Sequence, residues 1–552
     1  MAFNAVQEGE SFVPQSKPLT GMEDNRAGGY SYKVDDSTRF TRFLVLGADG
    51  GTYYYGEKEL KRENVQSLDR LVMAGRGPEA VNKIYEVSIE GRACKQNTCL
   101  YALALCARSD DPDTKLAAYK ILPEVCRIPT HLFMFIAFCE NESAGTGWGR
   151  AHRRAIGKWY NSFADKPDKL ANLVTKYQSR NKWSHVDVIR LSHIKPINYE
   201  VGFIIRYIAK DLEEACRMYC PQNPNNPSPV DLTLMKVKEF LQAVDSAKTC
   251  NDENMMVNLI RQYNLVREHV PTELLKSEKV WQALLQNMPM TAMIRNLGKM
   301  SSLKLFDNKN NESMVVKKLR NQNYLQESRI HPFNILVALK QYKAGKGDKG
   351  KLRWTANPNI LDALDEAFHL AFVNITPTGK RYLLAVDVSG SMNCPVMGNA
   401  SITARDAAAA MMMVTARVEE KYEVVAFAKD ISELPITAED TLQSVIGKCQ
   451  NHYFSGTDCA RPVMYAMEKK KLFDVFIVYT DSETYYGNIH PSEALKKYRT
   501  YANIPDAKLI VAGMASNGFS IADPNDRFMM DIVGFDSAAP QAIEFFVNGK
   551  TN

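Results

Sequence analysis

The sequence predicts two kinds of structure in one chain: a long array of paired α-helices, followed by a doubly wound α/β domain. From about residue 64 to 370, apolar residues recur with a period of 3.6 in segments separated by short breaks such as Asp111-Pro112-Asp113 and Lys195-Pro196. This is the pattern of amphipathic helices. From residue 376 the pattern changes to short apolar runs rich in β-branched residues, separated by helical stretches. Such alternation is typical of a parallel sheet that is buried on both faces.

Length and composition exclude several classes of protein. The chain has 552 residues, of which 45% are apolar and 24% are charged. Pervasive disorder, collagen and coiled-coil rods are therefore excluded, and two or more domains are expected. No uncharged apolar run approaches the ~18 residues of a transmembrane helix, and the first residues lack the basic and apolar regions of a signal peptide. We expect an intracellular protein without a membrane partner, whose 11 cysteines are reduced thiols.

The expected elements follow the chain in order. Residues 1–22 are polar and are expected to form a flexible tail. Residues 39–55 (RFTRFLVLGADGGTYYY) predict a short strand, a glycine turn and a second strand. Residues 23–375 otherwise form the helical module, in which helix pairs recur every ~35–45 residues as in a HEAT-like solenoid. Residues 376–552 form the α/β domain, with strands expected at 381–386, 423–428, 474–480 and 508–514.

Oxygen-bearing side chains are predicted to gather at one edge of that sheet. The strand RYLLAV runs into Asp387-Val388-Ser389-Gly390-Ser391, Thr457 lies in a glycine loop, and Asp481 directly follows the strand DVFIVYT. Ligand sites in open α/β sheets lie at the carboxyl ends of the strands. Hydroxyl and carboxylate oxygens suit Mg²⁺ or another hard divalent cation. The alternative is a turn whose oxygens merely cap the next helix.

The order D-x-S-x-S, then Thr, then Asp resembles the metal-ion-dependent adhesion site of von Willebrand factor A domains. The resemblance implies that Ser389, Ser391 and Thr457 bind the metal directly, while Asp387 and Asp481 act through water. An open position on the cation could then accept a carboxylate or phosphate from a partner.

The charge of the chain is unevenly distributed. Residues 376–552 hold 17 basic and 21 acidic side chains, whereas the preceding residues hold 52 and 42. Within that first part, residues 150–210 carry 13 Lys and Arg against 4 Asp and Glu. A one-sided basic segment favours a polyanion partner, although solvated helix faces are the simpler alternative.

Helical spacing assigns these cations to one side of successive helices. Arg150, Arg153, Arg154 and Lys158 lie opposite the apolar side of one helix. In a helix expected from Lys169 to Arg180, Lys176 and Arg180 share a face, and the next helix offers Arg190, His193 and Lys195. Such a surface neutralises phosphates and releases counterions.

Two motifs in the glycine segment 345–354 (GKGDKGKLRW) do not indicate nucleotide binding. Both G-x-G-x-x-G and the P-loop need a preceding strand, whereas a helix precedes this segment, and Leu352 stands where the P-loop needs Ser or Thr. A flexible basic hinge is expected instead. The sequence also holds no G-x-S-x-G elbow and no H-E-x-x-H spacing, so we expect a binding protein and not an enzyme.

Several long segments identify a family resemblance. They include EVCRIPTHLF (124–133), TKYQSRNKWSH (175–185), RLSHIKP (190–196), ALLQNMPMTAMIRNLGKM (283–300) and GKRYLLAVDVSGSM (379–392). The chain resembles the 60-kilodalton Ro autoantigen family, in which a TROVE module precedes a von Willebrand factor A domain. The resemblance extends from about Gly29 to the end of the chain. Gly390 departs from the alanine that we associate with vertebrate members.

The resemblance implies an architecture and a function. The solenoid is expected to close into a monomeric ring bridged by the A domain, with Y RNAs on its outer surface. Its central hole is expected to bind single-stranded 3′ ends of misfolded noncoding RNAs. The implied role is RNA quality control and ribonucleoprotein assembly. Lys176, Arg180 and His193 are expected to contact Y RNA, and the additional candidates are Arg127, His131, Arg150, Arg153, Arg154, Arg190 and Lys195. A cytoplasmic protein with a nuclear pool is expected. The alternative function is a protein-adhesion scaffold that holds an acidic partner at the metal.

Overall fold

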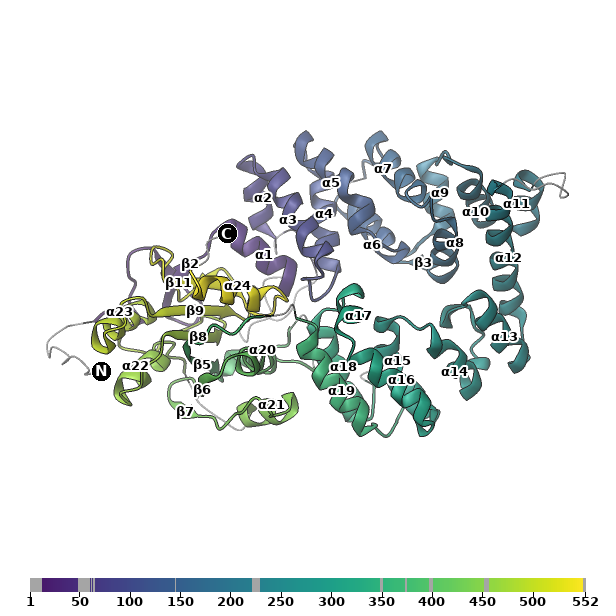
Figure 1. The fold of residues 1–552 in the computed structure, drawn as a ribbon. Helices are drawn as coiled ribbons and strands as arrows, with labels where there is room; N and C mark the ends of the chain where they lie inside the picture. The colour runs from purple at the N-terminus through teal and green to yellow at the C-terminus, as the bar shows by residue number, and fades with distance from the viewer. Residues whose placement is uncertain are drawn as a thin grey trace.

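The computed structural model describes residues 12–47, 60, 62, 65–143, 145–220, 229–347, 351–372, 375–396, 401–450 and 456–549. Figure 1 shows an upper arch of helices, a lower arch of helices, and a sheet domain at the left. Helix α12 connects the two arches at the right. Within the described residues, no helix has the length and apolar character needed to cross a bilayer.

The upper arch follows the helical periodicity of the sequence. Proline at the first turn and side-chain caps such as Asp111 on Thr114 N begin several of its helices. Its helices are α1 (Asp36–Leu46), α2 (Gln66–Met73), α3 (Gly77–Ile89), α4 (Asn97–Arg108), α5 (Pro112–Val125), α6 (Pro129–Asn141), α7 (Arg150–Asn161), α8 (Pro167–Lys176), α9 (His185–Ser192), α10 (Tyr199–Ala209) and α11 (Leu212–Tyr219), with a hairpin of β3 (Ser179–Arg180) and β4 (Trp183–Ser184) between α8 and α9.

The lower arch continues the same packing. It contains α12 (Pro229–Thr249), α13 (Glu253–Tyr263), α14 (Glu278–Gln286), α15 (Met290–Ser302), α16 (Lys309–Leu319), α17 (Gln322–Glu327), α18 (Pro332–Ala344) and α19 (Pro358–Leu370), with short 3-10 turns between some of them. Buried side chains of both arches form one continuous hydrophobic core. The predicted solenoid is therefore confirmed.

The second domain is the predicted doubly wound α/β fold. Its sheet has the order β11-β9-β8-β5-β6-β7, parallel except for the edge strand β7. The strands are β5 (Arg381–Asp387), β6 (Lys421–Phe427), β7 (Ile431–Glu433), β8 (Val475–Thr480), β9 (Lys508–Gly513) and β11 (Met529–Val533), and the helices are α20 (Ala404–Val418), α21 (Leu442–Gln450), α22 (Arg461–Glu468), α23 (Pro491–Ala502) and α24 (Ala539–Val547). Side chains of β5 alternate between two cores, with Leu384 in one and Leu383 in the other.

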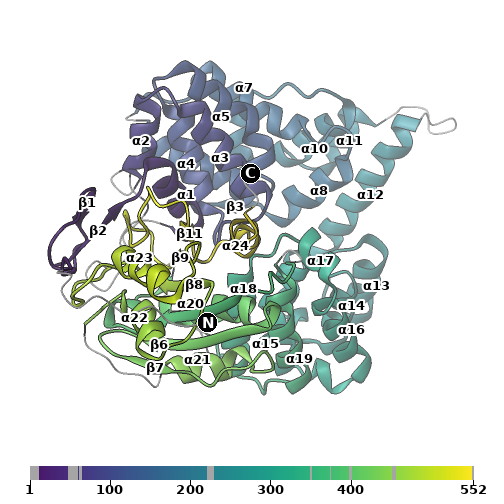
Figure 2. The ribbon, with the colours of Figure 1, turned by 60° about the vertical axis from the view of Figure 1, so that its left-hand side comes forward.

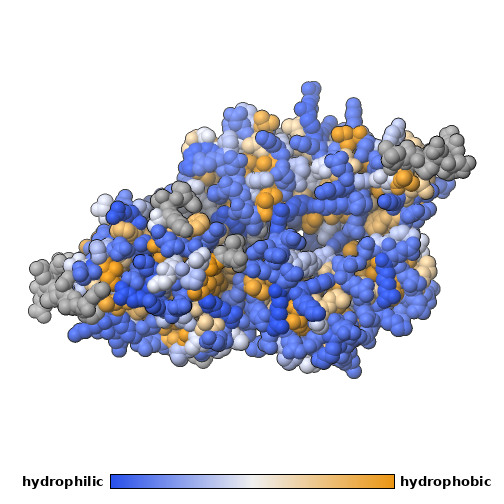
Figure 3. Space-filling model, in the orientation of Figure 1, coloured by the Kyte–Doolittle hydropathy of each residue, from blue (hydrophilic) through white to orange (hydrophobic). Residues whose placement is uncertain are grey.

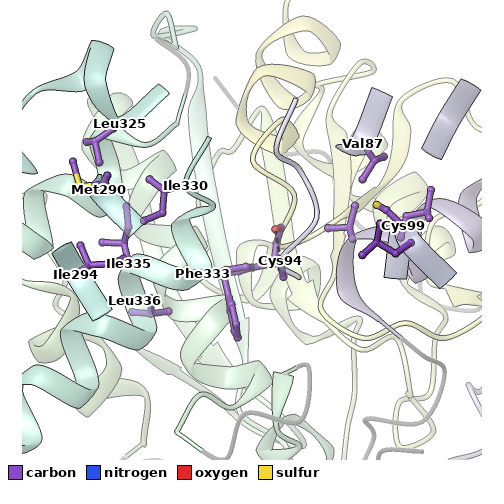
Figure 4. Packing of buried hydrophobic residues seen from close by; sticks show 14 of the residues in the cluster. Val87, Cys94, Cys99, Met290, Ile294, Leu325, Ile330, Phe333, Ile335 and Leu336 are labelled. Carbon is purple, nitrogen blue, oxygen red and sulfur yellow. Dashed lines mark hydrogen bonds between the residues drawn. The ribbon is translucent and has the colours of Figure 1, made fainter. Parts of the chain in front are cut away.

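The two ends of the solenoid meet each other and the sheet domain. Cys94 Sγ of the upper arch lies 3.9 Å from Nε2 of His331 at the start of α18, and both residues adjoin Phe535 of the sheet domain. Figure 4 shows Cys94 and Phe333 between apolar side chains of the two arches, such as Val87 on one side and Ile330 on the other. The helical array is thus closed on itself, as predicted.

Ion pairs join both arches to the sheet domain. On the upper arch, Arg92 contacts Asp536 at 2.7 Å. On the lower arch, Lys340 contacts Asp406 at 2.6 Å, and Arg417 contacts Asp365 at 3.0 Å. The sheet domain therefore bridges the two ends of the array.

The expected strand–turn–strand at 39–55 is wrong. Residues 36–46 form helix α1, with an N-cap from Asp35 to Thr38 N at 2.7 Å, and residues 48–55 lie outside the described residues. Helical spacing places Phe40, Phe43 and Leu44 in the core. It also directs Arg42, which is fully buried, to Asp531 of β11 at 2.7 Å.

The expectation of a flexible tail at 1–22 is not met by its described part, residues 12–22. Gln15 is fully buried, and its amide donates to Asp458 Oδ1 at 2.7 Å and to Ile489 O at 2.8 Å. Next come β1 (Met22–Asp24) and β2 (Tyr30–Lys33), which form a small sheet with β10 (Phe519–Ser520) of the A domain. Figure 2 shows this hairpin beside the sheet domain. We call residues 12–33 the N-terminal strap.

Candidate metal centre and basic surface

The metal loop is held rigidly at the end of β5. Asp387 is fully buried and accepts a bond from Ser389 N at 2.9 Å and another from Thr480 Oγ1 at 2.6 Å. The hydroxyl oxygens of Ser389 and Ser391 lie 3.1 Å apart. The alternation in D-x-S-x-S therefore brings both hydroxyls to one point above the strand.

Neighbouring strands bring the other two predicted ligands to the same edge. Asp481 directly follows β8, which pairs with β5, and Ser391 donates a hydrogen bond to its carboxylate. The loop that holds Thr457 is fixed to the end of β6, the other neighbour of β5, by Asp458 N donating to Ala428 O at 3.0 Å. The backbone carbonyl of Thr457 also accepts bonds from Tyr485 N and Tyr486 N. All five predicted residues thus lie on adjoining loops.

A sixth oxygen-bearing residue, Glu483, lies beside these five and was missed by the sequence analysis. Both of its carboxylate oxygens and Oδ2 of Asp481 are buried without a hydrogen-bond partner in the described protein. Burial, together with the Asp387 carboxylate, raises the pKa of Asp481 to about 7. Burial and the Asp481 carboxylate raise the pKa of Glu483 to about 8. Glu483 stands two positions after Asp481, and this spacing alone could have revealed it.

Buried carboxylate oxygens without a hydrogen-bond partner, beside two hydroxyls, fit a hard divalent cation, because burial of such charge demands compensation. Within the described ranges, no group of three or more His, Cys, Asp and Glu side chains has metal-binding geometry. The candidate centre is therefore the mixed hydroxyl–carboxylate set, with Ser389, Ser391 and Thr457 as neutral donors.

The N-terminal strap holds the loop that follows Asp481. Asn25 Nδ2 donates to Thr484 O at 2.6 Å, and Ser31 Oγ donates to Ser482 O at 2.9 Å. Thr484 in turn donates to Gln15, and Gly29 passes so close that an added Cβ would lie 1.9 Å from Thr484 O. Two loops of the metal site, at 457–458 and 481–484, therefore depend on a segment more than 400 positions away.

The basic helices are exposed where the sequence predicts it. On α7, Arg150, Arg153 and Arg154 are exposed, whereas Ala155 and Trp159 are buried. The space-filling view in Figure 3 shows a mainly hydrophilic face with small apolar groups between the charged side chains. This arrangement presents the α7 cations to solvent.

The expected helix from Lys169 to Arg180 is shorter than predicted. Helix α8 ends at Lys176, and Arg180 lies instead in the β3–β4 hairpin, where it is exposed. Trp183 of this hairpin packs against Trp148, which precedes α7, with ring centres 5.7 Å apart. Arg180 is therefore connected to the basic helix α7 through the hairpin and not through a shared helix face.

The third basic segment continues from α9. Arg190, His193 and Lys195 are exposed, and α9 ends at Ser192 because His193 adopts a left-handed conformation with φ 51°. A capping box of Ser184 and Asp187 begins this helix. Asn161, at the end of α7, donates to Lys195 O at 3.0 Å. Both ends of α7 thus contact the other basic segments.

The buried imidazole of His185 holds α7, α8 and α9 together. Its Nε2 donates to Tyr177 O at 3.1 Å, and its Nδ1 therefore accepts a hydrogen bond from Tyr160 Oη at 2.7 Å. Burial lowers the pKa of His185 to about 4, which keeps the imidazole neutral as this bonding requires.

Two predicted RNA contacts, Arg127 and His131, are half-buried. Arg127 donates to Ser88 O at 2.9 Å and to Gln96 Oε1 at 3.3 Å. Burial, followed by the Arg127 charge, lowers the pKa of His131 to about 3. Their contact with RNA stays a prediction.

Two family models match almost the entire chain. A model of the TROVE domain matches residues 23–341, and a model of the Ro60 vWA domain matches residues 381–547. The chain belongs to the Ro60 family. It is 39% identical to "RNA-binding protein RO60" of Caenorhabditis elegans, over 97% of this chain and 91% of that protein.

Bacterial members of the Ro60 family are similar over the same length. The protein of the same description from Deinococcus radiodurans is 36% identical over 97% of this chain and 98% of its own. The crystal structure of the Deinococcus radiodurans RO (RSR) protein matches with a TM-score of 0.67 at 34% identity, covering 94% of this chain and 100% of that one.

Proposed function

We propose that this chain is an RNA-binding protein that assembles with structured small noncoding RNA. The bound class is Y RNA on the basic surface of α7–α9, with single-stranded 3′ ends of misfolded noncoding RNAs taken into the ring. Its role is RNA quality control and ribonucleoprotein assembly, through binding and not through catalysis. The description of its Ro60 relatives as RNA-binding proteins supports this proposal.

The observation that carries the proposal is the absence of acidic partners along the basic surface. In residues 150–195, all of which are described, no Lys or Arg forms an ion pair with a carboxylate, although such pairs occur on both sides, at Arg108 and at Arg206. Solvated helix faces commonly pair such cations with nearby carboxylates at i,i+3 and i,i+4. A surface kept free of them is suited to phosphates.

The decisive experiment is equilibrium binding to a hairpin RNA with a single-stranded 3′ tail, at several salt concentrations and constant Mg²⁺. The variant Lys176→Glu with Arg180→Glu should weaken binding at least tenfold. The matched control is Lys317→Glu with Lys343→Glu, which reverses two exposed charges on α16 and α18. Equal losses in both variants would mean that net charge alone, and not this surface, attracts the RNA.

A second function is supported by the metal centre. We propose that it holds Mg²⁺ and presents an open coordination position to an acidic side chain of a protein partner. Oδ2 of Asp481 and both carboxylate oxygens of Glu483, which lack a hydrogen-bond partner in the described protein, favour a cation there. Calorimetric titration of the metal-free protein with Mg²⁺ tests the site, and no heat of binding would refute it.

A further inference from the structure

A large cavity lies in the lower arch, outside the metal centre and the α7–α9 surface. It has a volume of about 710 Å³ and opens between α15, α18 and the segment 267–276. Pockets that enclose small ligands span roughly 300–1,000 Å³. Neither the metal centre nor the α7–α9 surface accounts for it.

Among the described residues, the charged side chains that line this cavity are all positive. They are Arg267, Lys276, Arg295 and Lys299. Lys276 is paired with Glu273 at 2.6 Å. Within the described ranges, Arg267, Arg295 and Lys299 have no ion-pair partner. The cavity therefore offers several uncompensated cations to an anion.

Another part of the wall is aromatic and is fixed in place. Trp354 is half-buried, its indole nitrogen donates to Tyr342 O at 2.8 Å, and its ring stacks beside that of Tyr342 with centres 6.3 Å apart. The ring also covers Gly298, where an added Cβ would lie 2.8 Å from it. Because the N–H is already satisfied, what Trp354 offers to a ligand is its flat face.

The glycine segment brings this tryptophan to the cavity. Helix α18 ends at Gly345 in a left-handed conformation with φ 65°, and the chain returns so that Trp354 N donates to Gly345 O at 3.0 Å. Gly347 and Leu352 line the cavity as well. Trp354 thus lies beside the cations of α15, where its ring covers Gly298, and the segment does not cradle phosphates as a P-loop does.

A second, smaller cavity connects this wall to the basic surface. Arg267 and Asn296 line both cavities, and the smaller one is also lined by Lys176 at the end of α8. The cavity beside the cations of α15 and the smaller cavity beside Lys176 therefore share part of their walls.

We propose that the large cavity binds a nucleoside phosphate, either a free nucleotide or the unpaired terminal nucleotide of an RNA strand. Arg295 and Lys299 hold the phosphate, and the base stacks on Trp354. Asn334, which also lines the cavity, contacts the edge of the base. Arginine suits phosphate because its planar fork donates two parallel hydrogen bonds, and stacking on tryptophan accepts any base. The terminal-nucleotide source rests on the proposed RNA-binding function, whereas the free-nucleotide source does not.

The test uses the full-length protein and three small probes: uridine 5′-monophosphate, uridine and inorganic phosphate. Binding is followed by calorimetry and by quenching of tryptophan fluorescence. We expect saturable binding of the nucleotide with quenching, and at least tenfold weaker binding of uridine or phosphate alone. Arg295→Ala with Lys299→Ala should weaken nucleotide binding at least tenfold, whereas the control Lys317→Ala with Lys343→Ala should not.

A hairpin RNA with and without a 3′ tail distinguishes the two sources. If the ligand is an RNA end, Arg295→Ala with Lys299→Ala removes the preference for the tailed hairpin and leaves binding of the blunt hairpin unchanged. If the ligand is a free nucleotide, uridine 5′-monophosphate binds and the tail preference is unaffected. Three results would overturn the proposal. They are nucleotide binding that does not saturate, phosphate binding as tight as nucleotide binding, and a nucleotide affinity that Arg295→Ala with Lys299→Ala leaves unchanged. If the wild-type protein does not bind the blunt hairpin, that result instead contradicts the RNA binding proposed for the basic surface of α7–α9.

Discussion

The thiol of Cys94 and the imidazole of His331 lie 3.9 Å apart, although 237 positions separate them in the chain. His331 Nδ1 accepts from Phe333 N at 3.0 Å and caps α18, so its Nε2 faces the thiol and the Phe535 ring. This contact joins the loop between α3 and α4 to the start of α18. Because both groups are fully buried, the joint requires an uncharged histidine.

Acid should weaken this joint. Burial lowers the pKa of His331 to about 4, below the ~6.5 of an exposed histidine, so the unfolded chain binds the proton more readily. Its contribution to the free energy of unfolding is complete above pH ~6.5 and is lost as the pH falls toward 4. His331→Asn keeps a capping acceptor and should reduce the slope of stability against pH by up to ~1.4 kcal/mol per unit. Denaturant unfolding at pH 4 to 7 measures this slope, and an unaltered slope would contradict the assignment. The control is His193→Asn, at an exposed left-handed position.

Removing one charge of the buried pair Arg42–Asp531 should destabilise the protein more than removing both charges. Asp531→Leu leaves the guanidinium of Arg42 buried without its charge partner, and should cost about 3–5 kcal/mol of the free energy of unfolding. The double variant Arg42→Met with Asp531→Leu removes both charges and should recover part of this loss. Recovery stays incomplete because Arg42 also donates to Asn517 O and Phe519 O. Chemical denaturation measures the three variants, and a double variant no more stable than Asp531→Leu would refute the charge argument.

The N-terminal strap should be sensitive to one methyl group. Gly29→Ala places a Cβ 1.9 Å from Thr484 O, so the strap must move away from the metal loops. We expect destabilisation by more than ~1 kcal/mol and weaker Mg²⁺ binding. Gly447→Ala, where the new Cβ meets no atom within 4 Å, is the control and should be neutral or slightly stabilising. Thermal unfolding with and without Mg²⁺ compares them, and equal behaviour of both variants would show that the strap is dispensable.

Metal binding should depend on the paired serines. Mg²⁺ at one hundred times its Kd should raise the free energy of unfolding by about 2.7 kcal/mol, and Ser389→Ala with Ser391→Ala should abolish this gain. Gly390→Ala lies between them and meets no atom within 4 Å, so it should retain the gain. The melting temperature, recorded with EDTA and with Mg²⁺, is the readout. A metal-dependent shift that survives the double serine variant would place the cation elsewhere.

The α7 arginines should set the salt dependence of RNA binding. Arg153→Gln with Arg154→Gln keeps hydrogen-bonding capacity while removing two exposed charges. The slope of log Kd against log salt should fall in magnitude by about 1 for each lost phosphate contact. The slope is measured by filter binding of a hairpin RNA at KCl concentrations from about 50 to about 300 mM, a range around physiological ionic strength. An unchanged slope would remove α7 from the interface.

The features that the sequence predicts well are local ones. The strands of the sheet domain follow from short β-branched runs, and the metal residues follow because parallel strands bring their carboxyl ends to one edge. The capping box of Ser184 and Asp187 also needs only a four-residue segment. In each case the interacting groups are near in the chain or are aligned by a regular sheet.

The features that it misses depend on distant partners. Helix α1 has an apolar run and a glycine that imitate a strand, but its Arg42 finds Asp531 only after 489 positions. Gln15 and Asn25 look like tail residues until the A domain supplies their partners. Arg127 looks like a solvated cation in the sequence, and only the folded structure brings it to Ser88 of α3.

The strap has a consequence for how the protein is made. Gln15, Asn25 and Ser31 bond to residues between 458 and 489, so these contacts must wait until the ribosome has translated nearly all of the chain. The first helices are then finished well before their seam with the A domain can form. At ~5–20 residues per second, the upper arch remains without this seam for tens of seconds, and Arg42 lacks its partner Asp531. We therefore expect chaperones to bind the nascent chain during this interval, and we expect truncated products to aggregate.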